Sequence, residues 1–199
     1  MARIPPLPRE NVPELEGSFG PVEQRMGFLP NSLLTMARRP EILRAVASLV
    51  QAARTGTVSR ELKELVALVA STAAGCRYCQ AHTASNATRV GAEAAKLANV
   101  WSYETSDLFS DAERAALRLA HHAALVPNLA TEEDFEELRR FFDDGEIVEI
   151  VTVIALFGFL NRWNDTVATD LEPRPFAVAS EVIAVAGWEP GKHSTPHGA

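Results

Sequence analysis

Hydrophobic residues recur every three or four positions along most of the chain, which is the period of one face of an α-helix. The longest apolar stretch, residues 146–169, is hydrophobic on nearly all sides and predicts a long helix buried in a bundle or at an interface. No segment alternates strictly between apolar and polar residues with hairpin turns. The sequence therefore predicts an all-α bundle. Further helices are predicted at residues 31–36, 40–53, 59–74, 76–90, 92–99, 110–125, 131–142 and 176–185.

Residues that begin and end helices lie at the borders of these segments. Ser59 can accept a hydrogen bond from the first turn of a helix. Gly75 is a plausible stop, because glycine readily adopts the left-handed conformation that ends helices. Residues 17–30 are rich in turn-forming types and are expected to lack a long helix. Pro173 and Pro175 are expected to end the main helical body.

Residues 1–199 are predicted to form a single domain, since this length can bury a sizeable core without a second one. Prolines crowd residues 1–13 and predict an extended arm or a flexible tail. Residues 191–199 show no packing pattern and are expected to form a loose tail.

The composition excludes several classes of protein. Hydrophobic residues make up 47% and charged residues 23% of the chain, which is typical of a globular protein rather than a disordered one. A net charge of −7 argues against nonspecific nucleic-acid binding. No apolar run approaches the length of a membrane span, and no secretory signal opens the sequence. A cytoplasmic protein with a functional cysteine pair is therefore expected.

The reactive side chains gather within residues 59–90, the predicted redox core. Cys76 and Cys79 form a Cys-x-x-Cys pair, with His82 three residues later and Glu64 twelve residues before the pair. On a helix that opens at Cys76, the two thiols and the imidazole fall near one face. A thiolate is the reactive form of cysteine, and a second thiol within one turn can close a disulfide with an oxidised first one. A histidine and a carboxylate can move the protons that this chemistry requires.

The two cysteines admit other interpretations. Free cysteines are often inert core residues. A structural zinc site wants four ligands, and the chain has no second cysteine pair. A c-type haem needs a histidine directly after the second cysteine, where Gln80 stands. The spacing favours redox chemistry but leaves the order of the thiols open, because the helix N-terminus favours an acidic Cys76 and the nearness of His82 favours Cys79.

The segment from Glu64 to Val90 resembles the core of the carboxymuconolactone decarboxylase superfamily, in its alkylhydroperoxidase AhpD-like branch. That branch is marked by a glutamate, eleven further residues, a Cys-x-x-Cys pair and a histidine shortly after it, which Glu64, Cys76 and Cys79 match in type and spacing. In AhpD the histidine follows the second cysteine by four positions; here Thr83 holds that place and the histidine comes one position earlier. The Gly-Cys-x-Tyr-Cys segment is also similar to the peroxidase-related group.

The resemblance implies all-helical subunits that assemble into homo-oligomers, as trimers, hexamers or dimers. It implies that Cys79 is the peroxidatic residue and Cys76 the resolving one, with Glu64 and His82 as a proton relay. The thiolate would attack the O–O bond of a small hydroperoxide, and the resulting sulfenic acid would form a disulfide with the second thiol. An external dithiol of the lipoyl or thioredoxin type would restore the pair. No metal and no organic cofactor is expected.

Two other classes of function stay open, because a fold does not fix an activity. A lactone decarboxylase of the same superfamily would work without the cysteine pair. A redox sensor or a disulfide reductase would use the pair without peroxidase turnover.

Three further residues are candidates for structural roles. His121 and His122 are adjacent on a helix and point about 100° apart, so they are expected to be structural or solvated rather than joint metal ligands. Arg162 is expected to form a structural ion pair, with Asp165 or Glu172 as possible partners.

Overall fold

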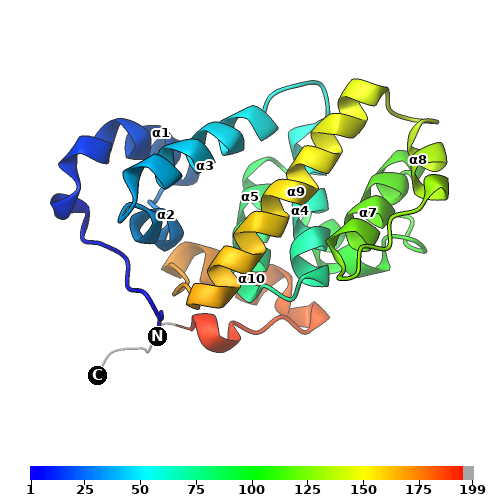
Figure 1. Cartoon of the computed structure of the whole chain (residues 1–199). Coiled ribbons are helices and arrows are strands. Elements are labelled where there is room, and N and C mark those ends of the chain that lie inside the picture. Colours follow the sequence, from blue (N-terminus) through cyan, green and yellow to red (C-terminus); the bar gives the residue numbers. More distant parts are fainter. Residues whose placement is uncertain (195–199) are drawn as a thin grey trace.

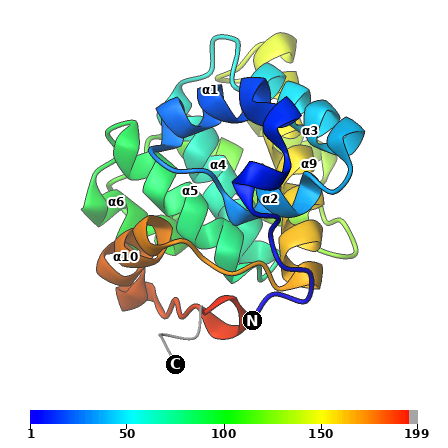
Figure 2. The same cartoon turned by 90° about the vertical axis from the view of Figure 1, so that its left-hand side faces the viewer.

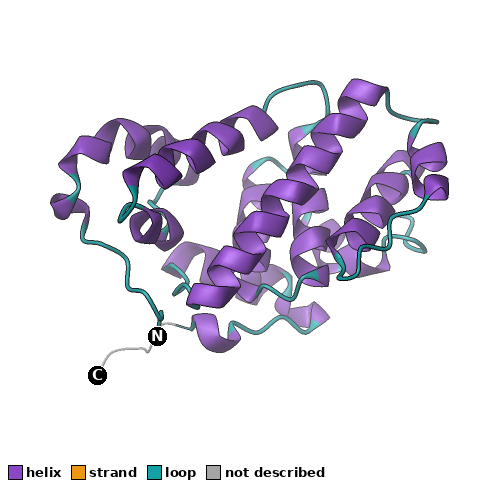
Figure 3. Cartoon of the chain, in the orientation of Figure 1, coloured by secondary structure: helices purple, strands orange, loops and turns teal. Residues whose placement is uncertain are grey.

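The computed structural model describes residues 1–194, which fold into helices joined by short loops with no strand among them (Figures 1 and 3). The predicted all-α fold is confirmed. The α-helices are α1 (Glu16–Met26), α2 (Asn31–Met36), α3 (Pro40–Ala53), α4 (Arg60–Ala73), α5 (Arg77–Arg89), α6 (Ala94–Ala98), α7 (Asp111–Ala124), α8 (Glu132–Leu138), α9 (Asp144–Val167) and α10 (Pro173–Val182). Short 3-10 helices lie at Arg9–Asn11, Pro13–Leu15, Val100–Ser102, Ala184–Ala186 and Gly191–His193.

Helices α4 and α5 form the centre of the molecule, and the main hydrophobic core is built around them. The long helix α9 runs diagonally across both, with α7 and α8 on one side and α1, α2 and α3 on the other (Figure 1). A second, smaller apolar cluster lies beneath the N-terminal helices and includes Leu15, Phe19 and Leu43. The predicted redox core is therefore enclosed by elements from both ends of the chain.

Predicted helix boundaries agree with the structure where a capping residue marks them. The Ser59 hydroxyl accepts a hydrogen bond from the Leu62 amide at 3.1 Å. Gly75 has φ +74°, the left-handed conformation expected after a helix. Helix α9 begins at Asp144, before the predicted start at residue 146, because the Asp143 carboxylate caps it.

The described part of the chain contains no helix with the length and hydropathy that a membrane span requires. Helix α9 is the longest, and it is not buried on all sides: the Val148 side chain is 64% exposed and Phe159 is 42% exposed. Its apolar outer face is therefore open to solvent in the single chain.

The first eight residues of the N-terminal arm are extended and are tied to the rest of the chain. The Arg3 amide donates to the Val167 carbonyl at 2.8 Å, and the Leu7 amide donates to the Leu34 carbonyl at 3.2 Å. Figure 2 shows the N-terminus beside the last described turn of the chain. The arm thus closes over the end of α9.

Two expectations from proline and glycine are wrong. Residues 17–30 contain helix α1 with Pro21 inside it, because Phe19, Val22 and Met26 form a buried face that outweighs the turn-forming residues. Pro173 does not end the helical body but begins α10, where the missing N–H of proline leaves no hydrogen bond unmade.

The expected loose tail is wrong for its first residues. Gly191–His193 forms a 3-10 helix, and the His193 side chain is fully buried. The Leu171 amide donates to the His193 carbonyl at 2.9 Å, which fixes this segment against the loop before α10. The rest of the expected tail, residues 195–199, lies outside the described residues.

Candidate active site

The two thiols sit where α4 turns into α5. Gly75 reverses the chain, and Cys76 then caps α5 in an extended conformation while its amide donates to the Ser71 carbonyl at 3.1 Å. Cys79 lies one turn into α5, so the thiols face each other within one helical turn. Both cysteines are free and buried.

Hydrogen bonding and burial distinguish the two thiols. A hydrogen bond from Cys79 lowers the pKa of the Cys76 thiol despite its burial. Burial raises the pKa of the Cys79 thiol well above its usual range. Of the two thiols, Cys76 is therefore the more acidic, and Cys79 holds its proton more strongly.

The amide of Asn164 on α9 favours a thiolate at Cys79. Its Nδ2 donates to Cys79 Sγ at 3.4 Å, and its Oδ1 accepts from the Thr169 hydroxyl at 2.9 Å, which fixes the orientation of the amide. Donation to the charged form of a group lowers its pKa, so this contact partly offsets the effect of burial. The amide would stabilise Cys79 once the proton has left.

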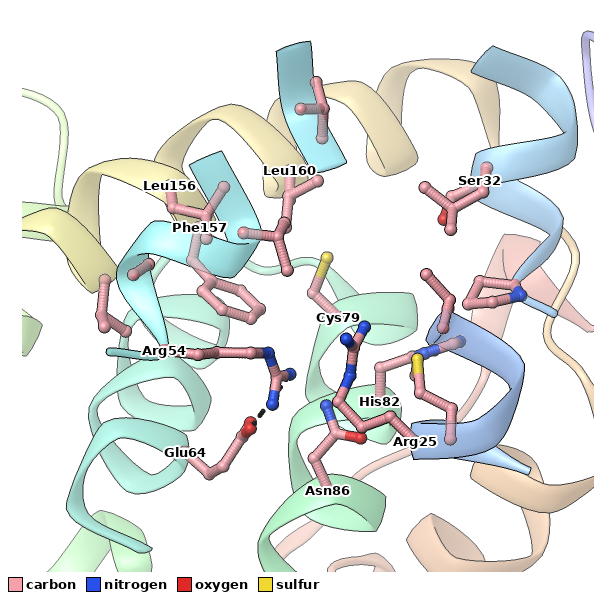
Figure 4. A pocket seen from close by; sticks show the side chains of 18 of the residues that line it. Arg25, Ser32, Arg54, Glu64, Cys79, His82, Asn86, Leu156, Phe157 and Leu160 are labelled. Atoms are coloured by element: carbon pink, nitrogen blue, oxygen red, sulfur yellow. Dashed lines mark ion pairs between the residues drawn. The ribbon is translucent and has the colours of Figure 1, made fainter. Parts of the chain in front are cut away.

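A cavity of about 130 Å³ lies over Cys79, between α5, α9 and the N-terminal helices (Figure 4). Cys79 points into it, whereas Cys76 is not among its lining residues. Most of the wall is apolar and comes from α1, α2, α3 and α9. The apolar lining side chains include Val22, Met26, Leu33, Val46, Val50, Val153, Leu156, Phe157 and Leu160. The polar end is formed by Arg25, Arg54, Arg60, Lys63, Glu64, His82 and Asn86.

Glu64 stands at the polar end of this cavity. It forms an ion pair with Arg54 at 3.4 Å and a hydrogen bond with Asn86 (Figure 4). Burial raises the pKa of the Glu64 carboxyl, against the influence of the Arg54 charge. Within residues 1–194, Glu64 and His82 share no hydrogen bond, so the relay between them stays a prediction that needs a bridging group.

His82 instead pairs with a carboxylate that the sequence motif does not contain. Its Nε2 lies 2.6 Å from Oε2 of Glu172, and its ring stacks on Tyr78 with centroids 4.2 Å apart. Oε1 of Glu172 accepts from the Tyr78 hydroxyl at 2.9 Å and from the Asn31 amide at 2.5 Å. Burial acts to raise the pKa of Glu172, but His82 and the donated hydrogen bonds outweigh it and lower that pKa.

Two of the other candidate residues, Arg162 and His122, differ in whether they form an ion pair. Because Glu172 pairs with His82 and Asp165 pairs with Lys192, the ion pair expected for Arg162 is wrong, and Arg162 forms none with any described residue. His122 pairs with Asp134 at 2.9 Å, which is the structural role expected of it. No local signal in the sequence links Glu172 to His82.

Comparison with known proteins places this arrangement in a family. Residues 40–122 match the model of the Carboxymuconolactone decarboxylase family. The apo structure of the debrominase Bmp8 is 37% identical and covers 90% of this chain and 97% of its own, with a TM-score of 0.84. An AhpD-core, peroxidase-related protein from Ralstonia eutropha JMP134 is 25% identical over 87% of this chain and 95% of its own, with a TM-score of 0.77. The chain belongs to the carboxymuconolactone decarboxylase superfamily, in its AhpD-like branch.

Other proteins similar to this chain include a debrominase and a protein of undescribed activity. A cysteine-to-alanine variant of Bmp8 has been solved in complex with 2,3,4-tribromopyrrole, at 37% identity and a TM-score of 0.85 to this chain. The uncharacterized protein YdfG of Bacillus subtilis (strain 168) is 24% identical over 126 residues, which are 63% of this chain and 84% of that protein. The AhpD-like fold thus occurs both in a peroxidase-related protein and in a debrominase. Family membership alone therefore does not determine the reaction of the Cys76–Cys79 pair.

Proposed function

We propose that this protein is a thiol-dependent peroxidase that reduces small organic hydroperoxides. The observation that carries the proposal is the asymmetry of the pair, since Cys79 faces a largely apolar cavity and Cys76 lies behind it. A nucleophile at the cavity with a second thiol one turn away is what a two-step reduction requires. The apolar wall favours a substrate with a hydrocarbon group over hydrogen peroxide.

The reaction begins when the proton on Cys79 passes to the Cys76 thiolate. The Cys79 thiolate attacks the terminal oxygen of the hydroperoxide, so an S–O bond forms and the O–O bond breaks. The leaving alkoxide takes a proton and departs as an alcohol, with His82 and Glu64 as the proposed proton relay. Cys79 is then a sulfenic acid.

The second step regenerates a stable product. Cys76, once deprotonated, attacks the sulfur of the sulfenic acid, an S–S bond forms, and hydroxide leaves and is protonated to water. An external dithiol of the lipoyl or thioredoxin type then reduces the disulfide. The net change is one hydroperoxide and one dithiol converted into an alcohol, water and one disulfide.

The guanidinium of Arg25 is placed to assist the first step. Arg25 lies at the polar end of the cavity, and its buried Nε has no hydrogen-bond partner among the described residues. Figure 4 shows Arg25 reaching toward the same space as Cys79. An unengaged donor in a partly desolvated site can stabilise the negative charge that develops on the leaving oxygen.

Reductive debromination of a small aromatic is the second candidate, and the similarity to Bmp8 favours it. The cysteine pair supplies the same two electrons. Cys79 would attack the bromine, and the carbon would keep the electrons of the C–Br bond and take a proton. Cys76 would then displace bromide from the S–Br intermediate and close the disulfide, so that two thiols and one bromide are accounted for.

Activity assays on three proteins test these proposals. The reduced wild type, Cys79→Ser and Cys76→Ser are each given excess dithiol with cumene hydroperoxide or a bromopyrrole. We expect sustained alcohol formation by the wild type, none by Cys79→Ser, and one turnover to a trapped sulfenic acid in Cys76→Ser. Bromide release without hydroperoxide consumption would refute the peroxidase and support the debrominase. A disulfide that forms without turnover of either substrate indicates a redox sensor or disulfide reductase.

We also propose that the chain forms a homo-oligomer through the groove between α7, α8 and α9. The groove has a volume of about 1110 Å³, and Arg162 is the only charged residue among those that line it. Val151, Phe159 and Trp163 of α9 contribute its apolar wall, which a second copy of the same surface would cover. Light scattering should show a multimer for the wild type and a smaller species for Phe159→Asp. A monomeric wild type at micromolar concentration rules the assembly out.

A further inference from the structure

A second polar cluster lies next to Cys76, the thiol that does not line the cavity. Cys76 Sγ, a carboxylate oxygen of Asp165 and an imidazole nitrogen of His193 all lie within 4.8 Å of one another. Asp165 comes from the C-terminal end of α9 and His193 from the last 3-10 helix. The side chains of Cys76 and His193 are both fully buried. The steps of the proposed peroxidase reaction at Cys79 use neither Asp165 nor His193.

The hydrogen bond at one ring nitrogen determines the state of the other. His193 Nδ1 lies 2.7 Å from the Thr169 carbonyl oxygen, which can only accept, so Nδ1 carries the ring proton. In the neutral ring Nε2 then has a free lone pair. This Nε2 is buried and has no hydrogen-bond partner among the described residues. An unpartnered buried acceptor next to a thiol is placed to receive a proton.

Among the described residues, few charged groups lie near His193. Asp165 Oδ1 lies 3.6 Å from Nε2, and Asp165 Oδ2 pairs with Lys192 at 2.7 Å. The Tyr78 ring is 5.9 Å away between centroids, and Cys76 is the remaining titratable neighbour within residues 1–194. Burial lowers the pKa of His193, which keeps the ring neutral and basic near pH 7. Once protonated, the ring would be stabilised by the Asp165 carboxylate.

We propose that His193 is the proton acceptor for Cys76 in the second half of the reaction, with Asp165 stabilising the imidazolium. This inference rests on the proposed dithiol function. When Cys79 becomes the nucleophile, its proton moves to Cys76, which must lose it again before it can attack. His193 Nε2 takes that proton, the Cys76 thiolate forms the S–S bond, and the group bound to Cys79 leaves.

The same residue acts in reverse when the disulfide is reduced. The external thiolate attacks Cys79 from the cavity, and Cys76 leaves as a thiolate that takes its proton back from His193. The two thiols would then have separate proton partners on opposite sides of the pair. His193 should affect the steps of Cys76 and leave the first attack by Cys79 unchanged.

The test separates the two steps in time and does not depend on peroxidase activity. Reduced protein reacts with a neutral dithiodipyridine, which releases one chromophore when Cys79 attacks and a second when Cys76 resolves the mixed disulfide. In His193→Gln we expect the first release within about twofold of wild type. The second release should be about 10²-fold slower or more, as for the loss of a positioned base. Asp165→Asn should slow only the second release, by a smaller factor.

Two further measurements distinguish a base from a structural residue. The rate of the second release should be nearly independent of pH around neutrality in wild type and should rise with pH in His193→Gln. Lys192→Ala is the matched control, because it removes a neighbouring contact to Asp165 without touching the ring. Thermal unfolding of each variant checks the fold.

Three results overturn the inference. One is an unchanged second release in His193→Gln, and another is an equal slowing of both releases. The third is stoichiometric Zn²⁺ retained by the reduced wild type and lost in His193→Gln, which makes His193 a metal ligand instead. Absence of hydroperoxide turnover in the wild type refutes the proposed peroxidase but leaves this assay intact.

Discussion

Replacement of Glu172 by glutamine should lower the free energy of unfolding, because it weakens three contacts of the carboxylate. One carboxylate oxygen lies 2.6 Å from His82 Nε2, and the other accepts from the Tyr78 hydroxyl and the Asn31 amide. The side chain is only 8% exposed, so water cannot replace these donors. Glutamine keeps one acceptor oxygen, but it turns an NH₂ group toward His82 and removes the negative charge.

The size of the effect follows from the kind of hydrogen bond that is lost. A hydrogen bond to a charged group contributes about 1.5–3 kcal/mol, and a neutral one about 0.5–1.5 kcal/mol. Glu172→Gln converts the contacts of a charged acceptor into neutral ones and disturbs the contact with His82. The free energy of unfolding at pH 7 should therefore fall by about 2–3 kcal/mol. For a chain of this size the melting temperature should drop by about 4–12 °C.

The effect should depend on pH in a defined direction. The pKa of Glu172 is lowered in the folded state. Its contribution to stability is therefore fully present above the pKa of the unfolded chain, about 4.3, and is lost as the pH falls through the lower folded value. The gap between wild type and Glu172→Gln should be largest near pH 7 and should close in acid.

Urea unfolding at matched protein concentration, at pH 7 and in steps below pH 5, measures this gap. Glu181→Gln is the control, because Glu181 is an exposed carboxylate on α10, the helix that follows Glu172. It should change the free energy of unfolding by less than about 0.5 kcal/mol. A gap of equal size at all pH values, or none at pH 7, would refute the reasoning.

Three further substitutions test the relay, the turn before the thiols and a glycine within α1. His82→Ala should slow the reaction with hydroperoxide near neutral pH and raise the pKa of the Cys79 thiol, measured as the pH dependence of its alkylation; an unchanged rate and profile exclude the relay role. Gly75→Ala should destabilise the fold by about 1 kcal/mol, because a side chain strains a residue at φ +74°. Gly20→Ala within α1 should stabilise it by about 0.5–1 kcal/mol, since a Cβ there meets nothing within 4 Å. Shifts of the same sign in both glycine variants contradict this argument.

The local signals in the sequence predicted the part of the site that is close in sequence. Ser59 and Gly75 bound α4 as expected, and the spacing of Cys76 and Cys79 placed both thiols within one turn. These features follow from hydrogen bonds and backbone angles within a few residues, which the amino-acid pattern encodes directly. The all-α fold follows from the same periodicity.

The partners of these residues could not be predicted, because they depend on tertiary packing. Glu172 lies 90 residues after His82, and no motif connects the two. His193 falls in a segment with no apolar period, so composition suggested a loose tail although the ring is fully buried. Helix α1 was missed for a related reason, since turn-forming residues concealed a short apolar face. The structures at Glu172, His193 and helix α1 all depend on contacts between residues that are far apart in the sequence.

The place of these partner residues in the sequence is relevant to how members of the superfamily differ in reaction. The family match covers residues 40–122, which contain both thiols, Glu64 and His82. The amide that contacts Cys79, the carboxylate that holds His82 and the imidazole near Cys76 are Asn164, Glu172 and His193, all beyond that range. The matched segment thus contains the dithiol, while the C-terminal third contributes the groups that contact Cys79 and His82 and lie near Cys76. If these groups control proton transfer at the two thiols as proposed, differences in reaction among relatives should follow this segment more closely than the cysteine motif.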